Sequence, residues 1–199
     1  VYRFLPHKTQ GEGFFLAALR KPEEDGEADT DLFSPKKKKS KGDTAASPVS
    51  KENLAIAKSW LASSDEYNLL VNGTAITAFP VYYQNDLALL RQSLRIVQAG
   101  TEVAEVKGKD LIPAHGLAMS RLLKTSVFPT EALTYEQAIA YLRKEAIVLP
   151  PSVPKGYVLV TYKEIPLGFV KNIGNRANNL YPQEWRIRSG YLPDDIRTL

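Results

Sequence analysis

The sequence predicts an α+β protein in which two small α+β units follow a flexible charged linker. Patterns typical of helices and of strands alternate over residues 51–188. Residues 22–50 carry an acidic block and four consecutive lysines but almost no large apolar side chain, so they cannot bury enough surface to offset the entropy of ordering. Residues 1–21 precede the linker and include an unbroken apolar run, Phe14–Leu19, typical of a strand buried on both faces.

The first unit, residues 51–128, opens with a helix. Ser50 has the chemistry of an N-cap, and Leu54, Ala57, Trp60 and Leu61 recur at helical spacing. Residues 67–80 then predict a hairpin, because Asn72-Gly73 favours the positive backbone dihedrals of a two-residue turn.

Shorter elements complete the first unit. We expect a helix over residues 85–94 capped by Asn85, strands over 94–100 and 101–108, and a helix over 114–123.

The second unit, residues 129–199, starts with a helix whose first turn has capping-box spacing at Thr134 and Gln137. Residues 156–172 predict two strands joined by a turn at 163–166, and 178–188 return the chain in a partly extended form.

Basic charge is concentrated in two folded segments. Residues 107–124 hold four Lys or Arg against one acidic residue, and residues 155–188 hold six against two. Such segments fit a polyanionic partner such as RNA. The candidate RNA-binding residues are Lys107, Lys109, Arg121, Lys124, Lys155, Lys163, Lys171, Arg176, Arg186 and Arg188. The lysine run in the linker allows two interpretations, a solvated charge or a nucleic-acid tether, and the first is favoured.

The sequence offers little for catalysis. It has no cysteine, so neither a disulfide nor a thiolate nucleophile is available, and a reducing, cytoplasmic location is expected. Its histidines, His7 and His115, lack companions at metal-ligand spacing, and Ser120 has no glycine elbow around it. His115 fits a structural role at a helix start. No apolar run approaches the roughly 20 residues of a membrane helix, so no membrane partner is expected.

Aromatic residues near the C-terminus allow both binding and packing. Trp185 lies between charged residues in "EWRIR", where aromatic and Arg side chains together suit stacking on RNA bases. If that stretch is a strand, alternation places Trp185 opposite Arg186 and Arg188. We therefore expect Trp185 in the core and the arginines on RNA, while Tyr181 fits either role.

Three ordered segments resemble one family. The stretch "RFLPHKTQGEGFFLAALRK" resembles the end of the catalytic domain of RsmF-type RNA (cytosine-5) methyltransferases of the Nop2/Sun group. "LRIVQAGTEVAEVKGKDLIPAHGLAMS" resembles the family's first C-terminal domain. "YLRKEAIVLP", "KGYVLVTYKEIPLGFVKN" and "NNLYPQEWRIR" resemble its terminal RNA-binding domain, which is PUA-like. One family position differs, because Asn178 stands where a lysine is common.

The resemblance implies a fold and a function. Residues 1–21 would contain a remnant strand of a Rossmann-like catalytic sheet, and residues 129–199 a PUA-like β-barrel. The parent protein would be an enzyme that methylates C5 of a cytosine in small-subunit ribosomal RNA with S-adenosylmethionine. The family's catalytic cysteines and cofactor-binding residues would lie upstream, so this chain would hold ribosomal RNA, or the small ribosomal subunit, for the upstream catalytic domain.

Two other functions fit the same residues. The chain could be a non-catalytic RNA-binding adaptor, or a protein-interaction module whose basic surface is incidental.

We predict that the 199-residue chain alone neither methylates RNA nor binds S-adenosylmethionine, because it has no cysteine and no glycine-rich cofactor loop. Calorimetric titration with the cofactor should be flat. Saturable micromolar binding would contradict this prediction.

Overall fold

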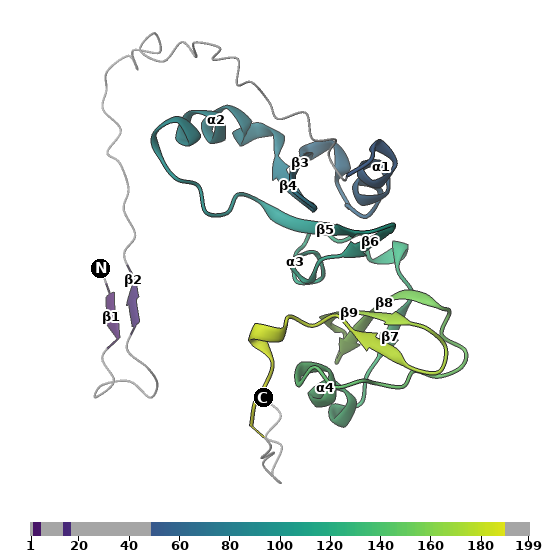
Figure 1. The fold of residues 1–199 in the computed structure, drawn as a ribbon. Helices are drawn as coiled ribbons and strands as arrows, with labels where there is room; N and C mark the ends of the chain where they lie inside the picture. The colour runs from purple at the N-terminus through teal and green to yellow at the C-terminus, as the bar shows by residue number, and fades with distance from the viewer. Residues whose placement is uncertain (1, 5–13, 17–48, 190–199) are drawn as a thin grey trace. The chain divides into compact units, whose positions relative to one another are not determined.

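The computed structural model describes residues 2–4, 14–16 and 49–189 (Figure 1). The chain divides into two compact units, residues 1–44 and 45–199. In the first, strand β1 (Tyr2–Phe4) pairs antiparallel with β2 (Phe14–Leu16). The expected apolar strand thus begins at its predicted residue. Residues 22–48 of the expected linker lie outside the described residues.

The second compact unit contains two four-stranded sheets. The first sheet is antiparallel throughout, in the order β3-β4-β5-β6. Its strands are β3 (Tyr67–Asn72), β4 (Ala75–Pro80), β5 (Thr101–Lys107) and β6 (Asp110–Pro113). Helices α1 (Lys51–Ser59), α2 (Gln84–Ser93) and α3 (His115–Ala118) accompany it.

The second sheet is mixed, in the order β10-β9-β8-β7, with β7 parallel to β8 and the other pairs antiparallel. Its strands are β7 (Thr130–Ala132), β8 (Gly156–Tyr162), β9 (Ile165–Asn172) and β10 (Ala177–Asn179). Helix α4 (Tyr135–Leu142) lies between β7 and β8 in the chain. Short 3-10 turns are η2 (Ser64–Glu66), η3 (Val81–Tyr83), η4 (Thr125–Val127) and η5 (Gln183–Trp185).

The α+β class is confirmed, whereas the expected barrel is not closed in the described part of the chain. Strands β7 and β10 do not pair with each other, so the second sheet stays open. The free side of β10 is instead covered by an isolated bridge, in which the Ala177 N–H donates to the Ile147 carbonyl at 2.9 Å. That bridge satisfies backbone groups that barrel closure would otherwise pair.

Two of the three predicted helix caps are present. The Ser50 hydroxyl accepts a hydrogen bond from the Asn53 N–H at 3.1 Å, at the start of α1. At the start of α4, Thr134 and Gln137 each bond the other's backbone N–H, which is a complete capping box. These caps satisfy N–H groups that have no partner inside the helix.

Several local expectations need correction. The turn between β3 and β4 is Gly73–Thr74, one residue later than predicted, because Asn72 already pairs with Ala75. Helix α2 has no side-chain cap, so Asn85 does not start it. Residues 94–100 form no strand and are mostly exposed.

The helix expected over residues 114–123 is only the four-residue α3. Its early end has a local cause. The Ser120 hydroxyl donates to the Leu117 carbonyl at 2.9 Å and accepts from the Leu122 N–H at 3.3 Å. A side chain that bonds nearby backbone groups in this way competes with continued helix.

One of the two hydrophobic core clusters contains residues from both sheets. Helix α3 contacts both β5 and β9, and in Figure 1 it lies between the two sheets. Phe128, in the connection between the sheets, packs against Trp60 after α1 and against Phe169 on β9, with ring centroids 5.2 and 4.8 Å apart. Leu117 of α3 is fully buried in the same cluster. Residues from both sheets are therefore buried together in this cluster, while a second cluster, which includes Tyr141, is buried within the part formed by α4 and the second sheet.

Gly168 on β9 is required by its surroundings. Its φ of +143° is strained for other residues, and a Cβ there would lie 2.2 Å from the Tyr141 hydroxyl oxygen and 2.9 Å from His115 Nδ1. Tyr141 cannot move away easily, because it is fully buried and its hydroxyl donates to the Phe169 carbonyl at 3.2 Å.

We predict that Gly168→Ala lowers the free energy of unfolding by about 2 kcal/mol or more, the sum of backbone strain and overpacking. Urea unfolding would measure it. Gly156→Ala is the matched control, since Gly156 has a φ of +118° in the same sheet but nothing within 4 Å of an added Cβ. Equal losses in the two variants would show that the contacts with Tyr141 and His115 carry no cost.

Candidate nucleic-acid interface

Five of the ten candidate RNA-binding residues come together at one end of the second sheet. In strand register, Gly156 at the start of β8 pairs with Asn172 at the end of β9, and Asn172 also pairs with Ala177 at the start of β10. The turn between β5 and β6 reaches this end, because Lys171 Nζ bonds Asp110 Oδ2 at 2.6 Å. We call the set the basic end: Lys107, Lys109, Lys155, Lys171 and Arg176.

The cations of the basic end differ in exposure and in whether they are already paired with an acidic side chain. Lys171 is half-buried, lies over the Tyr157 ring with Nζ 5.5 Å from its centroid, and is paired with Asp110. Its pKa is raised, first by that hydrogen bond and then by Tyr157. Lys155 is exposed, and its chain passes Gly174, whose missing side chain leaves room for it. Lys171 therefore has to exchange Asp110 for any phosphate that it binds.

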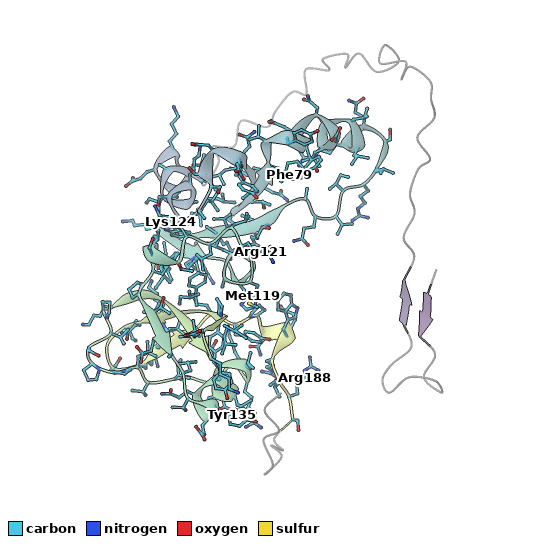
Figure 2. The ribbon with its side chains drawn as sticks, turned by 180° about the vertical axis from the view of Figure 1, so that it is seen from behind. Phe79, Met119, Arg121, Lys124, Tyr135 and Arg188 are labelled. Carbon is cyan, nitrogen blue, oxygen red and sulfur yellow. The ribbon has the colours of Figure 1, made fainter. Side chains whose placement is uncertain are left out.

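The other five candidates lie elsewhere, so the structure does not bring all ten to one face. Lys163 occupies the β8–β9 turn at a φ of +48°, with Nζ 5.8 Å from the centroid of the Tyr162 ring. The whole of β8, seven residues, separates it from Lys155, which is about 23 Å at some 3.3 Å a residue. Arg121 and Lys124 follow α3 in the part that packs near α1, and Figure 2 shows Lys124 far from Arg188.

Arg186 and Arg188 line a separate hollow of about 300 Å³ with Arg143 and Glu145. Arg143 was not predicted from the sequence. Its guanidinium donates to the Ser189 carbonyl at 2.9 Å, which ties the C-terminal segment to the end of α4. Its position just after a helix does not reveal this role in the sequence, because the helix dipole alone favours Arg there.

Trp185 is where the sequence prediction is wrong. It lies in the 3-10 turn η5, not in a strand, and its side chain is 63% exposed rather than in the core. Pro182 opens that turn and has no N–H for a ladder, so the alternation that placed Trp185 inside does not apply.

An aromatic group supports Trp185 from behind. The His115 ring lies edge-on to Trp185 and to Tyr181, with centroids 5.4 and 5.1 Å away, and Tyr181 also packs against buried Tyr141. Tyr181 is half-buried, so of its two predicted roles the structure favours packing. His115 stands at the start of a helix, as predicted, but its side chain makes no capping hydrogen bond.

Hydrogen bonds between side chains and the backbone hold this aromatic group in place. The Asn179 side-chain amide donates to the carbonyls of Tyr141 and Glu145, at 2.7 and 2.9 Å, and its oxygen accepts from the Tyr181 N–H. Lys144, in the left-handed region at φ +67°, donates its ammonium to the Tyr181 carbonyl. Asn179 and Lys144 were missed in the sequence, because their partners lie across the fold.

A groove runs beside these aromatic residues, along the junction of the two sheets. Its volume is about 800 Å³, and we call it the seam groove. It is lined by β5, by the start of α3 and by the segment that carries Trp185, and its charged side chains are Glu102, Glu105, Lys107, Lys144 and Glu184.

Two side chains that line the seam groove, His115 and Glu102, have pKa values shifted by their surroundings. Burial, and then the nearby Lys144 ammonium, lower the pKa of His115, so its ring is neutral at pH 7. Partial desolvation and the charge of Glu105 raise the pKa of Glu102, although its side chain reaches solvent.

The described residues carry neither a membrane span nor a metal site. No helix among them is long and apolar enough to cross a bilayer. Nor do any three acidic or histidine side chains in that part of the chain gather to hold a metal ion. The fold and the basic end together define an α+β protein with a surface suited to a polyanion.

Comparisons with known proteins identify the family that the chain resembles. Residues 128–187 match the family model described as the methyltransferase RsmF PUA domain. The chain is 28% identical over 188 residues to the ribosomal RNA small subunit methyltransferase F of Enterobacter sp. (strain 638), covering 91% of this chain and 36% of that protein. It is 29% identical over 195 residues to the protein of the same name from Aliivibrio fischeri (strain MJ11), covering 94% and 38%.

These matches confirm the resemblance to an RsmF-type C-terminal region with a PUA domain. The chain spans a little more than a third of the length of the curated relatives that it matches. The division between two domains at residues 128 and 129 stays a prediction.

The lowered pKa of His115 predicts a pH dependence of stability. Because the unfolded histidine has a pKa near 6.5, the unfolded chain binds this proton more readily than the folded chain. The free energy of unfolding should therefore fall as the pH decreases from about 7 toward the folded pKa of His115. The free energy of unfolding of the His115→Gln variant should fall less over the same range. An NMR titration of His115 with a midpoint above 6.5 would contradict this.

Proposed function

We propose that this chain is the RNA-binding part of a ribosomal RNA methyltransferase and holds the RNA through the basic end. Two observations support the proposal. Residues 128–187 match an RsmF PUA domain, and the five cations of the basic end come together from the β5–β6 hairpin and from one end of β8, β9 and β10. Cations on turns can reach the phosphate backbone without blocking a sheet face.

The rest of the proposed activity follows from the relatives. They are named as methyltransferases of small-subunit ribosomal RNA. In the whole protein, a catalytic part outside this chain would transfer a methyl group from S-adenosylmethionine to C5 of a cytosine. This chain would set the position of the RNA, because phosphate contacts fix register and orientation without reading bases. We propose the upstream catalytic domain and ribosomal RNA as its partners.

A second candidate, a protein-interaction module, has one observation in its favour. Large apolar side chains around α2 are exposed, among them Tyr82 at 85% and Val97 at 93%. They lie on the first sheet's side of the chain and not at the basic end, so substitutions can separate the two functions. Val97→Asp should leave RNA binding unchanged if the basic end is the RNA site.

We predict that Lys155→Gln or Arg176→Gln weakens binding to a small-subunit ribosomal RNA fragment and lowers the salt slope, d log K/d log [salt], by about 0.7–0.9 each. Lys163→Gln is the matched control at the far end of the β8–β9 hairpin, and it should leave the slope unchanged. Asp110→Asn should tighten binding, because it frees the Lys171 ammonium and removes a charge that repels phosphate.

Anisotropy titrations over a range of salt concentrations would measure these effects, with circular dichroism to check folding. Equal effects of the Lys155 and Lys163 substitutions would mean that the charge acts diffusely. Absence of RNA binding at low salt would refute the proposed function.

A further inference from the structure

We propose that the seam groove binds one unpaired RNA base, stacked on the exposed indole of Trp185. This inference rests on the proposed function, since it assumes that the chain binds RNA. It assigns a ligand to a surface that the basic end does not include, apart from Lys107, which belongs to both.

Trp185 has the exposure and the rigidity of a stacking platform. It is 63% exposed, whereas the other tryptophan, Trp60, is 6% exposed in the core. Its own N–H bonds the Pro182 carbonyl at 3.3 Å, and the Ile187 N–H bonds the Leu142 carbonyl at 2.9 Å. The backbone is held on both sides of the indole, so a base would meet a platform that needs no ordering.

The ring behind Trp185 strengthens this arrangement. His115 contacts the indole at an interplanar angle of 75° and is itself backed by Tyr181. Because the imidazole is neutral near pH 7, it adds no charge to the groove. The aromatic cluster therefore fixes the indole from one side and leaves its remaining surface to solvent.

The charges of the groove favour a base over a phosphate. Glu102, Glu105 and Glu184 outnumber Lys107 and Lys144 along the lining, and Lys144 already donates to the Tyr181 carbonyl. Carboxylates repel phosphate, but they accept hydrogen bonds from the amino groups on base edges. A volume of about 800 Å³ is ample for a nucleotide.

The position of Lys107 links the two surfaces. It lines the seam groove and stands at the end of β5, opposite Asp110 in the hairpin that meets Lys171. An RNA strand whose phosphates lie on the basic end can thus place a neighbouring base in the groove. The same carboxylates and indole would also suit a Lys or Arg side chain of a protein, but the basic end beside them would repel a cationic peptide.

Fluorescence of the 199-residue chain tests this inference directly. The chain has two tryptophans, so the difference between the emission of the wild type and of Trp185→Phe isolates Trp185. Short single-stranded oligocytidine should quench that component, and polyphosphate, which has charge but no bases, should not.

Affinity measurements supply a second readout. Trp185→Ala should weaken oligocytidine binding about tenfold, in the range that loss of one base stack gives. Its salt slope should stay that of the wild type, because no phosphate contact is removed. Trp185→Phe keeps an aromatic face and should retain most of the affinity, which separates stacking from a general loss of structure.

The outcomes distinguish this inference from the proposed function. If RNA binds with the wild-type salt slope and affinity to Trp185→Ala, the base site is overturned and the RNA-binding function stands. If a lysine-rich peptide quenches Trp185 and oligocytidine does not, the groove takes a protein ligand and the inference is overturned. If no RNA binds at low salt, the proposed function fails and the inference fails with it.

Discussion

The packing of α3 between the two sheets is the constraint on which the candidate sites depend. Leu117 is fully buried there, and Gly116 lets the helix approach β5 so closely that an added Cβ would lie 3.3 Å from the Glu102 carbonyl oxygen. The same short helix directs His115 toward Tyr181 and Trp185. Phe128, packed on Trp60 and Phe169, holds the sheets together beside it. Both walls of the seam groove are therefore positioned by core packing.

Whether a charged side chain of this protein can bind a ligand depends on the groups already paired with it as much as on the number of charges nearby. The Lys171 ammonium is paired with Asp110, and the Lys144 ammonium donates to a backbone carbonyl. The side chains of Lys155 and Arg176 are exposed. The basic end is consequently rich in cations, whereas carboxylates outnumber ammonium groups in the seam groove, although Lys107 belongs to both. One surface suits phosphates and the other suits an uncharged, flat group. Together they match the two chemical parts of a nucleotide strand.

Local contacts were predicted well. The Ser50 cap and the Thr134–Gln137 capping box join residues three apart, so the residue types alone specify them. Predictions that needed knowledge of a neighbouring strand failed more often. Residues 94–100 have strand-like composition but form no strand, and it is the following segment, β5, that pairs with β4. Trp185 was placed inside by an alternation that holds only within a strand.

The sequence by itself determined the α+β class, helices α1, α2 and α4, the β3–β4 and β8–β9 hairpins, the two basic segments and the resemblance to RsmF-type proteins. These properties depend on residue type, on periodicity and on contacts of a few residues. Only the tertiary structure decided which cations share one end, which of them is paired, and that Trp185 faces solvent above His115. The reason is physical: His115 and Trp185, like Asp110 and Lys171, come from distant segments, and only burial of the shared core brings them together.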